Sequence, residues 1–412
     1  SADGALAGEA RARLLAAPAL VELLSDLLLC TGPRAASVRE SLRSVEAAAH
    51  PSRGEGVAAA VGAALGEAGL HGAARELLAA DAARSIGHIS GNSPGDLGVP
   101  AEQHGEMVAR LAVLVPPEGE CARNPVGPAA EGALTALAAL TAYCEGARLA
   151  AAELAGDPGG GLLGSLVALA GPPQALMVQA YAATAIGNVS EARGAVCAAV
   201  ATEQRLGRLA AVLASAAPEA FAPASGDGSE GASDSRFAAA SVSGCLMNLA
   251  RSGAGTALAG CPRVLDALAA VLGSAADGGS PAATDETLAS CVGYSAAATG
   301  AMLLDSPEAR ELVAGHPRAL RSLASALLVP NEGVRRAAAC SLACVVPTPG
   351  GSGKSARKEW SAKGRHRSSA PQEAELLRSL IEENQGVKTV LGAMTGAEDA
   401  TLRQCAAWLL SQ

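Results

Sequence analysis

The chain has 412 residues and a net charge of −9, and half of its residues are apolar although only 2% are aromatic. An acidic surface repels phosphate backbones, and so few rings leave little for bases to stack on, which argues against nucleic acid as the main ligand. A core filled by alanine, leucine and valine suits closely packed helices, because sheets favour β-branched and aromatic residues. The composition therefore predicts an all-α protein.

Helical runs with a stripe of small residues recur along the chain. The pattern is an aliphatic residue at the start, alanine near the fifth and sixth places, an aliphatic residue at the ninth and a variable residue at the eleventh; 238–248 and 288–298 match it more loosely, and 133–144 supplies an intervening helix. Places 1, 5, 9 and 12 share one helical face, so each run is expected to be an amphipathic helix. In chain order the runs are 78–88 (LAADAARSIGH), 133–144 (ALTALAALTAYC), 178–188 (VQAYAATAIGN), 238–248 (AAASVSGCLMN), 288–298 (LASCVGYSAAA), 334–344 (VRRAAACSLAC) and 402–412 (LRQCAAWLLSQ).

The spacing of the runs predicts a repeat protein. Supporting helices are expected upstream of the runs, at residues 19–29, 263–272 and 319–328. Two polar stretches, 222–235 and 347–372, are expected to be flexible insertions, and without them the runs recur every 42 to 50 residues. That period fits two or three helices per unit, and such units must stack because none can bury its apolar face alone. The sequence predicts a single array over residues 1–412, in which residues 37–49 form a degenerate first unit.

Three runs end in a way that resembles a known repeat. Residues 186–190 (IGNVS) and 246–250 (LMNLA) are similar to the end of the third helix of armadillo repeats, and residues 86–90 (IGHIS) place a histidine where those have asparagine. The resemblance implies an all-α, right-handed α-solenoid of about eight armadillo-like repeats.

The resemblance also implies a set of partner-binding residues. In armadillo-repeat proteins the asparagine lines a concave groove and hydrogen-bonds the backbone of an extended bound peptide. The equivalent places in this chain are His88, Asn188, Asn248, Cys344 and Gln412. Nuclear-import adaptors of the family also carry a groove tryptophan four residues before the asparagine, where this chain has Thr184 and Gly244, so binding of nuclear signals is not expected. An amide at a helix end can instead cap a loop or bond a neighbouring turn.

No motif predicts an enzyme. Residues 342–355 (LACVVPTPGGSGKS) resemble a phosphate-binding loop, but Thr348 stands at the place of its first glycine, and residues 356–367 lack the periodicity of a helix packed on a sheet. Residues 226–231 (GDGSEG) match a dinucleotide-binding pattern without a strand before them. The six histidines are scattered and the ten cysteines form no CxxC pair, so neither a metal nor a cofactor is expected.

The remaining features concern location and charge. Free cysteines in apolar helices fit a reduced, cytoplasmic compartment, with a ciliary or organellar location left open. No signal peptide opens the chain, which also lacks an initiator Met, so a processed product or a piece of a longer protein is expected. The uncharged stretches 158–190 and 287–304 are too broken or too polar for a bilayer span of about 20 apolar residues.

Residues 354–367 carry six basic residues and one acidic residue. Such a composition is typical of a solvated tether, or of a segment that folds into the groove or binds an acidic partner.

The predicted function is a protein–protein interaction scaffold that takes a basic or neutral extended segment along its groove. Two alternatives stay open. The array could be the client-binding half of a co-chaperone or assembly factor, or a structural subunit of a cytoskeletal or ciliary complex. The sequence does not indicate an oligomeric state.

Overall fold

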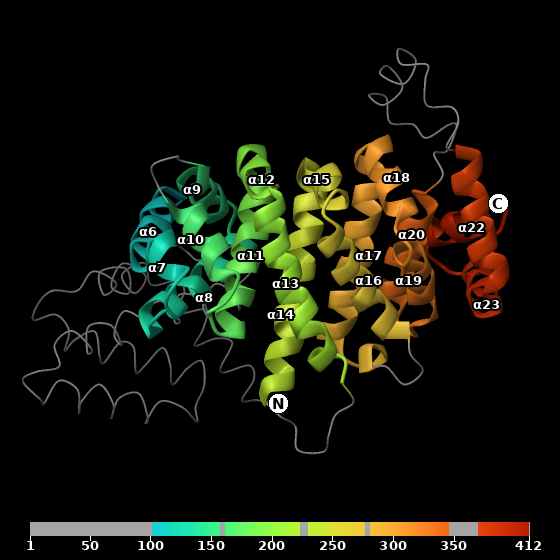
Figure 1. Ribbon diagram of the computed structural model, residues 1–412, viewed down its shortest axis with the longest axis horizontal. Coiled ribbons are helices and arrows are strands. Elements are labelled where there is room, and N and C mark those ends of the chain that lie inside the picture. The colour runs from blue at the N-terminus through green and yellow to red at the C-terminus, as the bar shows by residue number, and fades with distance from the viewer. Residues whose placement is uncertain (1–100, 157–160, 223–229, 277–280, 346–369, 412) are drawn as a thin grey trace, which may run out of the picture. The chain divides into compact units, whose positions relative to one another are not determined.

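The computed structural model describes residues 101–156, 161–222, 230–276, 281–345 and 370–411. All regular secondary structure within these ranges is helical, as the composition predicts (Figure 1). The chain divides into two compact parts between Val196 and Cys197, and each part is described by itself.

The helices follow one another in sets of three. In the first part they are α6 (Ala101–Leu114), α7 (Glu118–Cys121), α8 (Pro128–Tyr143), α9 (Glu145–Gly156), α10 (Leu162–Leu169) and α11 (Leu176–Ala192), and α12 (Gly194–Val200) contains the boundary. The second part continues with α13 (Glu203–Ala220), α14 (Glu230–Leu249), α15 (Gly255–Ala259), α16 (Pro262–Ala276), α17 (Glu286–Asp305), α18 (Pro307–Gly315), α19 (Ala319–Ser325), α20 (Glu332–Ala343), α22 (Ala370–Glu383), α23 (Gln385–Met394) and α24 (Ala400–Ser411). Short turns of other helix types are η1 (Ala250–Ala254), η2 (Pro281–Ala283) and η3 (Ala326–Leu328). The described residues thus hold six sets, α6–α8, α9–α11, α12–α14, α15–α17, α18–α20 and α22–α24.

In the first part each helix packs on its counterpart in the next set. α6 contacts α9, α7 contacts α10, and α8 contacts α11. The fully buried large side chains of this part include Leu134, Leu137 and Leu140 of α8 and Ile186 of α11. These leucines recur every three residues along α8, and the alanines between them let α11 approach closely.

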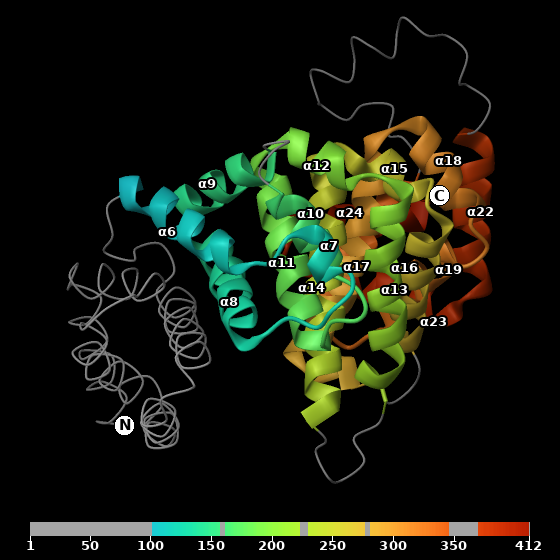
Figure 2. The same cartoon turned by 60° about the vertical axis from the view of Figure 1, so that its left-hand side comes forward.

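The second part repeats this arrangement over more sets. The second helices α13, α16 and α19 pack in sequence, and so do the third helices α14, α17, α20 and α24. Figure 2 shows α14 and α17 in one layer of this part and α13, α16 and α19 in another. The two layers face each other, because α13 contacts α14 and α16 contacts α17.

Small polar side chains join the third helices inside the second part. The hydroxyl of Ser295 on α17 donates to the hydroxyl of Ser243 on α14 at 3.0 Å. On the other side of α17, the hydroxyl of Ser341 on α20 donates to the carbonyl oxygen of Ala296 at 2.8 Å. Gly300 lies against Ser341, where an added Cβ would stand 2.8 Å from the Ser341 Cβ. Small side chains at these crossings therefore set the distances between the helices.

Side-chain caps determine where several helices begin. Asp285 accepts a hydrogen bond from the amide of Leu288 at the start of α17, and Asn331 accepts one from the amide of Val334 at the start of α20. Each cap satisfies an amide that has no partner inside its own helix. Asp285 also forms an ion pair with Arg236 at 3.0 Å, which ties the start of α17 to α14.

One glycine allows the chain to turn out of the third-helix layer. α14 runs into the π-helical turn η1, where Gly253 has a φ of 97°. This left-handed conformation is open to glycine at little cost and strained for other residues. The kink separates α14 from α15, which starts the next set.

α17 is long and apolar enough to cross a membrane by length and composition alone. In this structure 61% of its most apolar window is buried, and the helix packs between α14 and α20. Buried Ser295 and Thr299 on this helix form hydrogen bonds inside the protein. The core helix of a stacked protein has these properties, so we assign α17 that role.

The structure bears out the helical runs that it describes. The runs at 133–144, 178–188, 238–248, 288–298 and 334–344 lie in α8, α11, α14, α17 and α20, and residues 402–411 lie in α24. The expected helices at 263–272 and 319–328 are also present, the latter as α19 with η3. The helices expected at 19–29, 37–49 and 78–88 lie outside the described residues, and the total of about eight repeats stays a prediction.

The expected insertions differ from the structure at their ends. Residues 230–235, expected to belong to a flexible insertion, form the first turns of α14. The physical reason is a fixed contact, because the fully buried Ser235 donates its hydroxyl to Glu219 of α13 at 2.8 Å. Residues 370–372, the end of the second expected insertion, likewise begin α22.

Candidate partner-binding surface

Each third helix of the second part leaves one stripe of side chains accessible. On α14 the stripe runs through Ser241, Gly244 and Asn248, and on α17 it runs through Ser290, Tyr294 and Ala297. On α20 it runs through Arg336, Cys340 and Cys344. The neighbouring third helices and the second-helix layer bury the other sides of α14 and α17. The stripes therefore lie on one side of the layer, and we call them together the third-helix face.

Tyr294 is an exposed aromatic side chain of this face, with a fractional exposure of 39%. Its ring lies beside Gly244 on α14, and a Cβ at Gly244 would stand 3.4 and 3.6 Å from two ring carbons. The ring therefore lies against α14, which packs on α17. An exposed ring with a polar hydroxyl suits contact with a protein partner.

Asn248 lies one helical turn after Gly244 and is half-buried. Within the described part of the chain, its side chain has no hydrogen bond to another residue. An amide in this position has both a donor and an acceptor to offer a peptide backbone. Its assignment as a partner-binding residue stays a prediction that this geometry permits.

Asn188 occupies the same place in its run and has a different environment. Its amide nitrogen donates to the hydroxyl of Thr141 on α8 at 3.2 Å and lies 3.5 Å from the carbonyl oxygen of Ala138. Thr141 is buried and donates in turn to the Leu137 carbonyl oxygen at 2.7 Å. The Asn188 amide therefore bridges two third helices of the first part. This is the bond to a neighbouring helix that sequence reasoning kept as an alternative to partner binding.

Of the other predicted binding residues, the structure describes only Cys344. Cys344 is half-buried at the end of α20, and its thiol donates to the carbonyl oxygen of Cys340 at 3.1 Å. Burial raises the pKa of Cys344 to about 11, so the thiol is protonated and apolar at neutral pH. His88 and Gln412 lie outside the described residues.

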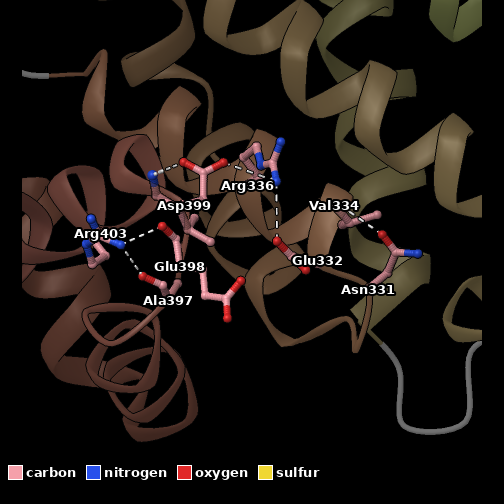
Figure 3. A network of polar contacts seen from close by, with 9 residues as sticks. Asn331, Glu332, Val334, Arg336, Ala397, Glu398, Asp399 and Arg403 are labelled. Carbon is pink, nitrogen blue, oxygen red and sulfur yellow. Dashed lines mark hydrogen bonds and ion pairs between the residues drawn. The ribbon is translucent and has the colours of Figure 1, made fainter.

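The charge of Arg336 is balanced locally (Figure 3). Its guanidinium lies 3.3 Å from Glu332 on its own helix and 3.1 Å from Asp399 at the start of α24. Asp399 also caps α24 by accepting from the amide of Leu402, while Arg403 donates to the carbonyl oxygens of Ala397 and Glu398 at 2.6 Å. The arginine thus joins the last two sets and adds no unmatched positive charge to the third-helix face.

A shallow cavity of about 340 Å³ lies on the second-helix layer, between α13 and α16. Its walls are mainly alanines, and Arg263, Asp266 and Arg318 form the polar part. Asp266 binds Arg318 at 2.6 Å and lies 3.4 Å from His316, and these contacts lower the pKa of its carboxyl. The ion pair offsets the charge of Arg318, and the helices that line the cavity are not those of the third-helix face.

The described residues contain no group of three or more histidine, cysteine or acidic side chains able to hold a metal ion. The phosphate-loop-like glycines after Val345 lie outside the described ranges, and so does most of the pattern at 226–231. Of that pattern the structure describes only its end, which is the first turn of α14.

Sequence reasoning missed two features of the third-helix face. Tyr294 stands at the seventh place of its run, four residues before the eleventh place. Nuclear-import adaptors have the groove tryptophan at this place, but the run of Tyr294 lacks the asparagine that marks it. Checking that place in every run would have found it. The second feature is the contact between Cys340 and Cys405, whose sulfurs are 3.6 Å apart. These residues lie 65 positions apart, and no spacing within a single run indicates their contact.

No family model matches the sequence, and no curated protein matches it. A designed armadillo repeat protein in complex with the peptide (KR)4 is 15% identical, over 76% of this chain and 96% of that chain, with a TM-score of 0.34. SYS-1 is 11% identical, over 91% of this chain and 63% of that chain, at 0.46, and a structure from work on cadherin and beta-catenin is 13% identical, over 95% and 68%, at 0.35.

These TM-scores lie below 0.5, so the fold assignment rests on the helices themselves. Three-helix sets, each packed counterpart on counterpart, give each part an armadillo-like α-solenoid arrangement.

Proposed function

We propose that this protein is a scaffold that binds an extended, basic or neutral segment of another protein across the third-helix face. The observation that carries the proposal is Tyr294, whose exposed ring lies beside Gly244, with the Asn248 amide one turn away from that glycine. An aromatic ring offers a side-chain contact, and the amide offers hydrogen bonds to the partner backbone. The two together suit an extended segment that crosses successive helices.

The charges support the preference for a basic or neutral segment. The whole chain carries a net charge of −9, and the arginine of the third-helix face is already paired with Glu332 and Asp399. An acidic segment would meet long-range repulsion without a free cation to offset it on this face. A basic segment would instead associate faster, and more so at low salt.

The proposal can be tested with a displayed library of unstructured peptides, panned against the full chain. We expect enrichment of basic or neutral sequences and no enrichment of acidic ones. Tyr294→Ala should weaken binding of an enriched peptide by about 2 kcal/mol, roughly thirtyfold in Kd, if the ring is a central contact.

Leu312→Ala is the matched control. Leu312 lies on α18, outside the third-helix face, and 40% of its side chain is exposed against 39% for Tyr294. It should leave the Kd unchanged, and circular dichroism should show both variants folded. Equal losses for the two variants, or no enriched peptide at all, would contradict the proposal.

A further inference from the structure

Two thiols on different helices meet between the last two sets of the second part. The Cys405 thiol of α24 donates a hydrogen bond to the sulfur of Cys340 on α20, with the sulfurs 3.6 Å apart. Both side chains are half-buried, and both cysteines are free thiols. A disulfide needs the sulfurs at about 2.05 Å. The two sulfurs thus lie about 1.5 Å further apart than in a disulfide.

The surroundings shift the pKa values of the two thiols in opposite directions. The hydrogen bond from Cys405 lowers the pKa of Cys340 to about 7, against the effects of burial and of Asp399, and Arg336 one turn away acts in the same direction. The same hydrogen bond and burial raise the pKa of Cys405. Cys340 therefore loses its proton more readily than an ordinary thiol, whereas Cys405 keeps its proton. The thiolate is the form that attacks oxidants.

Three other thiols of the described residues differ from Cys340 in the direction of their pKa shift. Burial raises the pKa of Cys291 to about 12, and burial also raises those of Cys121 and Cys344 to about 11. Cys344 lies one turn after Cys340 on the same helix and bonds to a backbone carbonyl. It therefore serves as a neighbour of similar position and different chemistry.

We propose that Cys340 and Cys405 form a redox modification site at which a peroxide converts the thiol pair into a disulfide. The Cys340 thiolate attacks one peroxide oxygen and breaks the O–O bond, giving a sulfenic acid at Cys340 and releasing hydroxide when the oxidant is hydrogen peroxide. The Cys405 sulfur, on losing its proton, then attacks the Cys340 sulfur, forms the S–S bond and displaces hydroxide. The proton that Cys340 gave up on forming its thiolate and the proton lost by Cys405 combine with the two hydroxides to give two waters. Two thiols are oxidised by two electrons, and one peroxide is reduced to two waters.

The disulfide would fasten the last set to the set before it. α24 packs on α20 and α23, and the Arg336–Asp399 ion pair joins α20 to the start of α24 (Figure 3). A bond between residues 65 positions apart restricts the unfolded chain and adds a covalent link to these weaker contacts. Oxidation should therefore stabilise the end of the array. The inference does not depend on what the third-helix face binds.

The test uses the full chain, reduced, desalted and exposed to an equimolar amount of hydrogen peroxide, then blocked with N-ethylmaleimide. Mass spectrometry of a digest made without reductant should show the Cys340 peptide joined to the Cys405 peptide, with two fewer blocked thiols. The melting temperature should rise by several degrees and return to its starting value on addition of dithiothreitol.

Variants assign the roles of the two sulfurs. Cys405→Ser should stop at a sulfenic acid on Cys340 that dimedone traps, whereas the matched control Cys344→Ser should still form the disulfide. In the unmodified chain, the rate of Cys340 alkylation by iodoacetamide should be half-maximal near pH 7. In Cys405→Ala the midpoint should move upward toward the ordinary value of about 8.5, because the donor to the thiolate is gone.

Several results would overturn the proposal. These are a Cys340 that stays reduced under peroxide, a link from Cys340 to Cys344 or between two chains, and an alkylation midpoint near that of an ordinary thiol. The cross-link and the midpoint are measured on the unmodified chain, so the proposal remains testable even if a variant fails to fold.

Discussion

The bond from Asn188 to Thr141 should contribute about 1 kcal/mol to the free energy of unfolding. It is a 3.2 Å hydrogen bond between two third helices, and a typical intramolecular hydrogen bond contributes 0.5 to 1.5 kcal/mol, about 1 on average. The 3.5 Å approach to Ala138 is too long to add much. Thr141 keeps its 2.7 Å bond to the Leu137 carbonyl oxygen when Asn188 is removed, so no large penalty for an unsatisfied group arises.

A single substitution would hide part of this contribution. Alanine has a better helix propensity than asparagine by about 0.5 kcal/mol, so Asn188→Ala should cost only about 0.5 kcal/mol net. Asn248→Ala makes the same propensity gain and loses no hydrogen bond to a described residue. The difference between the two variants should therefore be about 1 kcal/mol, with Asn188→Ala the less stable.

A double-mutant cycle isolates the bond. Asn188→Ala, Thr141→Val and the combined variant are unfolded in urea and followed by circular dichroism. Thr141→Val also removes the bond to Leu137, but it does so in both backgrounds and that effect cancels. We expect a coupling energy of about 1 kcal/mol. A coupling below about 0.3 kcal/mol, the usual limit of additivity, would refute the structural role of Asn188.

Two further pairs of substitutions test the contacts of α17 and its neighbours. Asp285→Ala removes a helix cap of about 1 kcal/mol and an ion pair of about 0.2 to 1 kcal/mol. Asn331→Ala removes only a cap. Urea unfolding should therefore show the larger loss of unfolding free energy for Asp285→Ala. Equal losses would mean that the ion pair with Arg236 contributes nothing. Gly300→Ala should destabilise by about 1 to 3 kcal/mol, because its new Cβ would stand 3.0 Å from the Ser341 Cα and push α20 away from α17. Gly293→Ala, where a Cβ meets no atom within 4 Å, is its control and should be neutral or slightly stabilising.

The sequence predicted the third helices well because their signal is local. Alanines at fixed places, with aliphatic residues one turn apart, define an amphipathic helix without any knowledge of its neighbours. The start of α14 was not predicted, because residues 230–235 have the polar composition of a linker. Their helical conformation depends on Ser235 binding Glu219 of α13, a contact between segments that no local pattern contains.

The candidate site was less predictable for a related reason. Asn188 and Asn248 occupy the same place in similar runs, and the repeat pattern treats them alike. What separates them is whether a hydroxyl lies within reach on the neighbouring helix, as Thr141 does for Asn188. That depends on the distance and register between helices, which vary with each pair of small residues in contact. The same limit hid the sulfur contact of Cys340 and Cys405.

Small buried residues and large exposed ones lie side by side on the third helices. At the crossings of α14, α17 and α20 buried serine and cysteine side chains make the polar contacts, and Gly300 lies close against Ser341. Tyr294 and Arg336 lie on the accessible stripes of the same helices. A substitution in a stripe changes the surface offered to a partner, whereas a substitution one position away changes a helix crossing. Residues that would contact a partner and residues that hold the helices together are thus adjacent on the same helices. A variant in a stripe, compared with a variant at the neighbouring buried position, separates an effect on binding from an effect on stability.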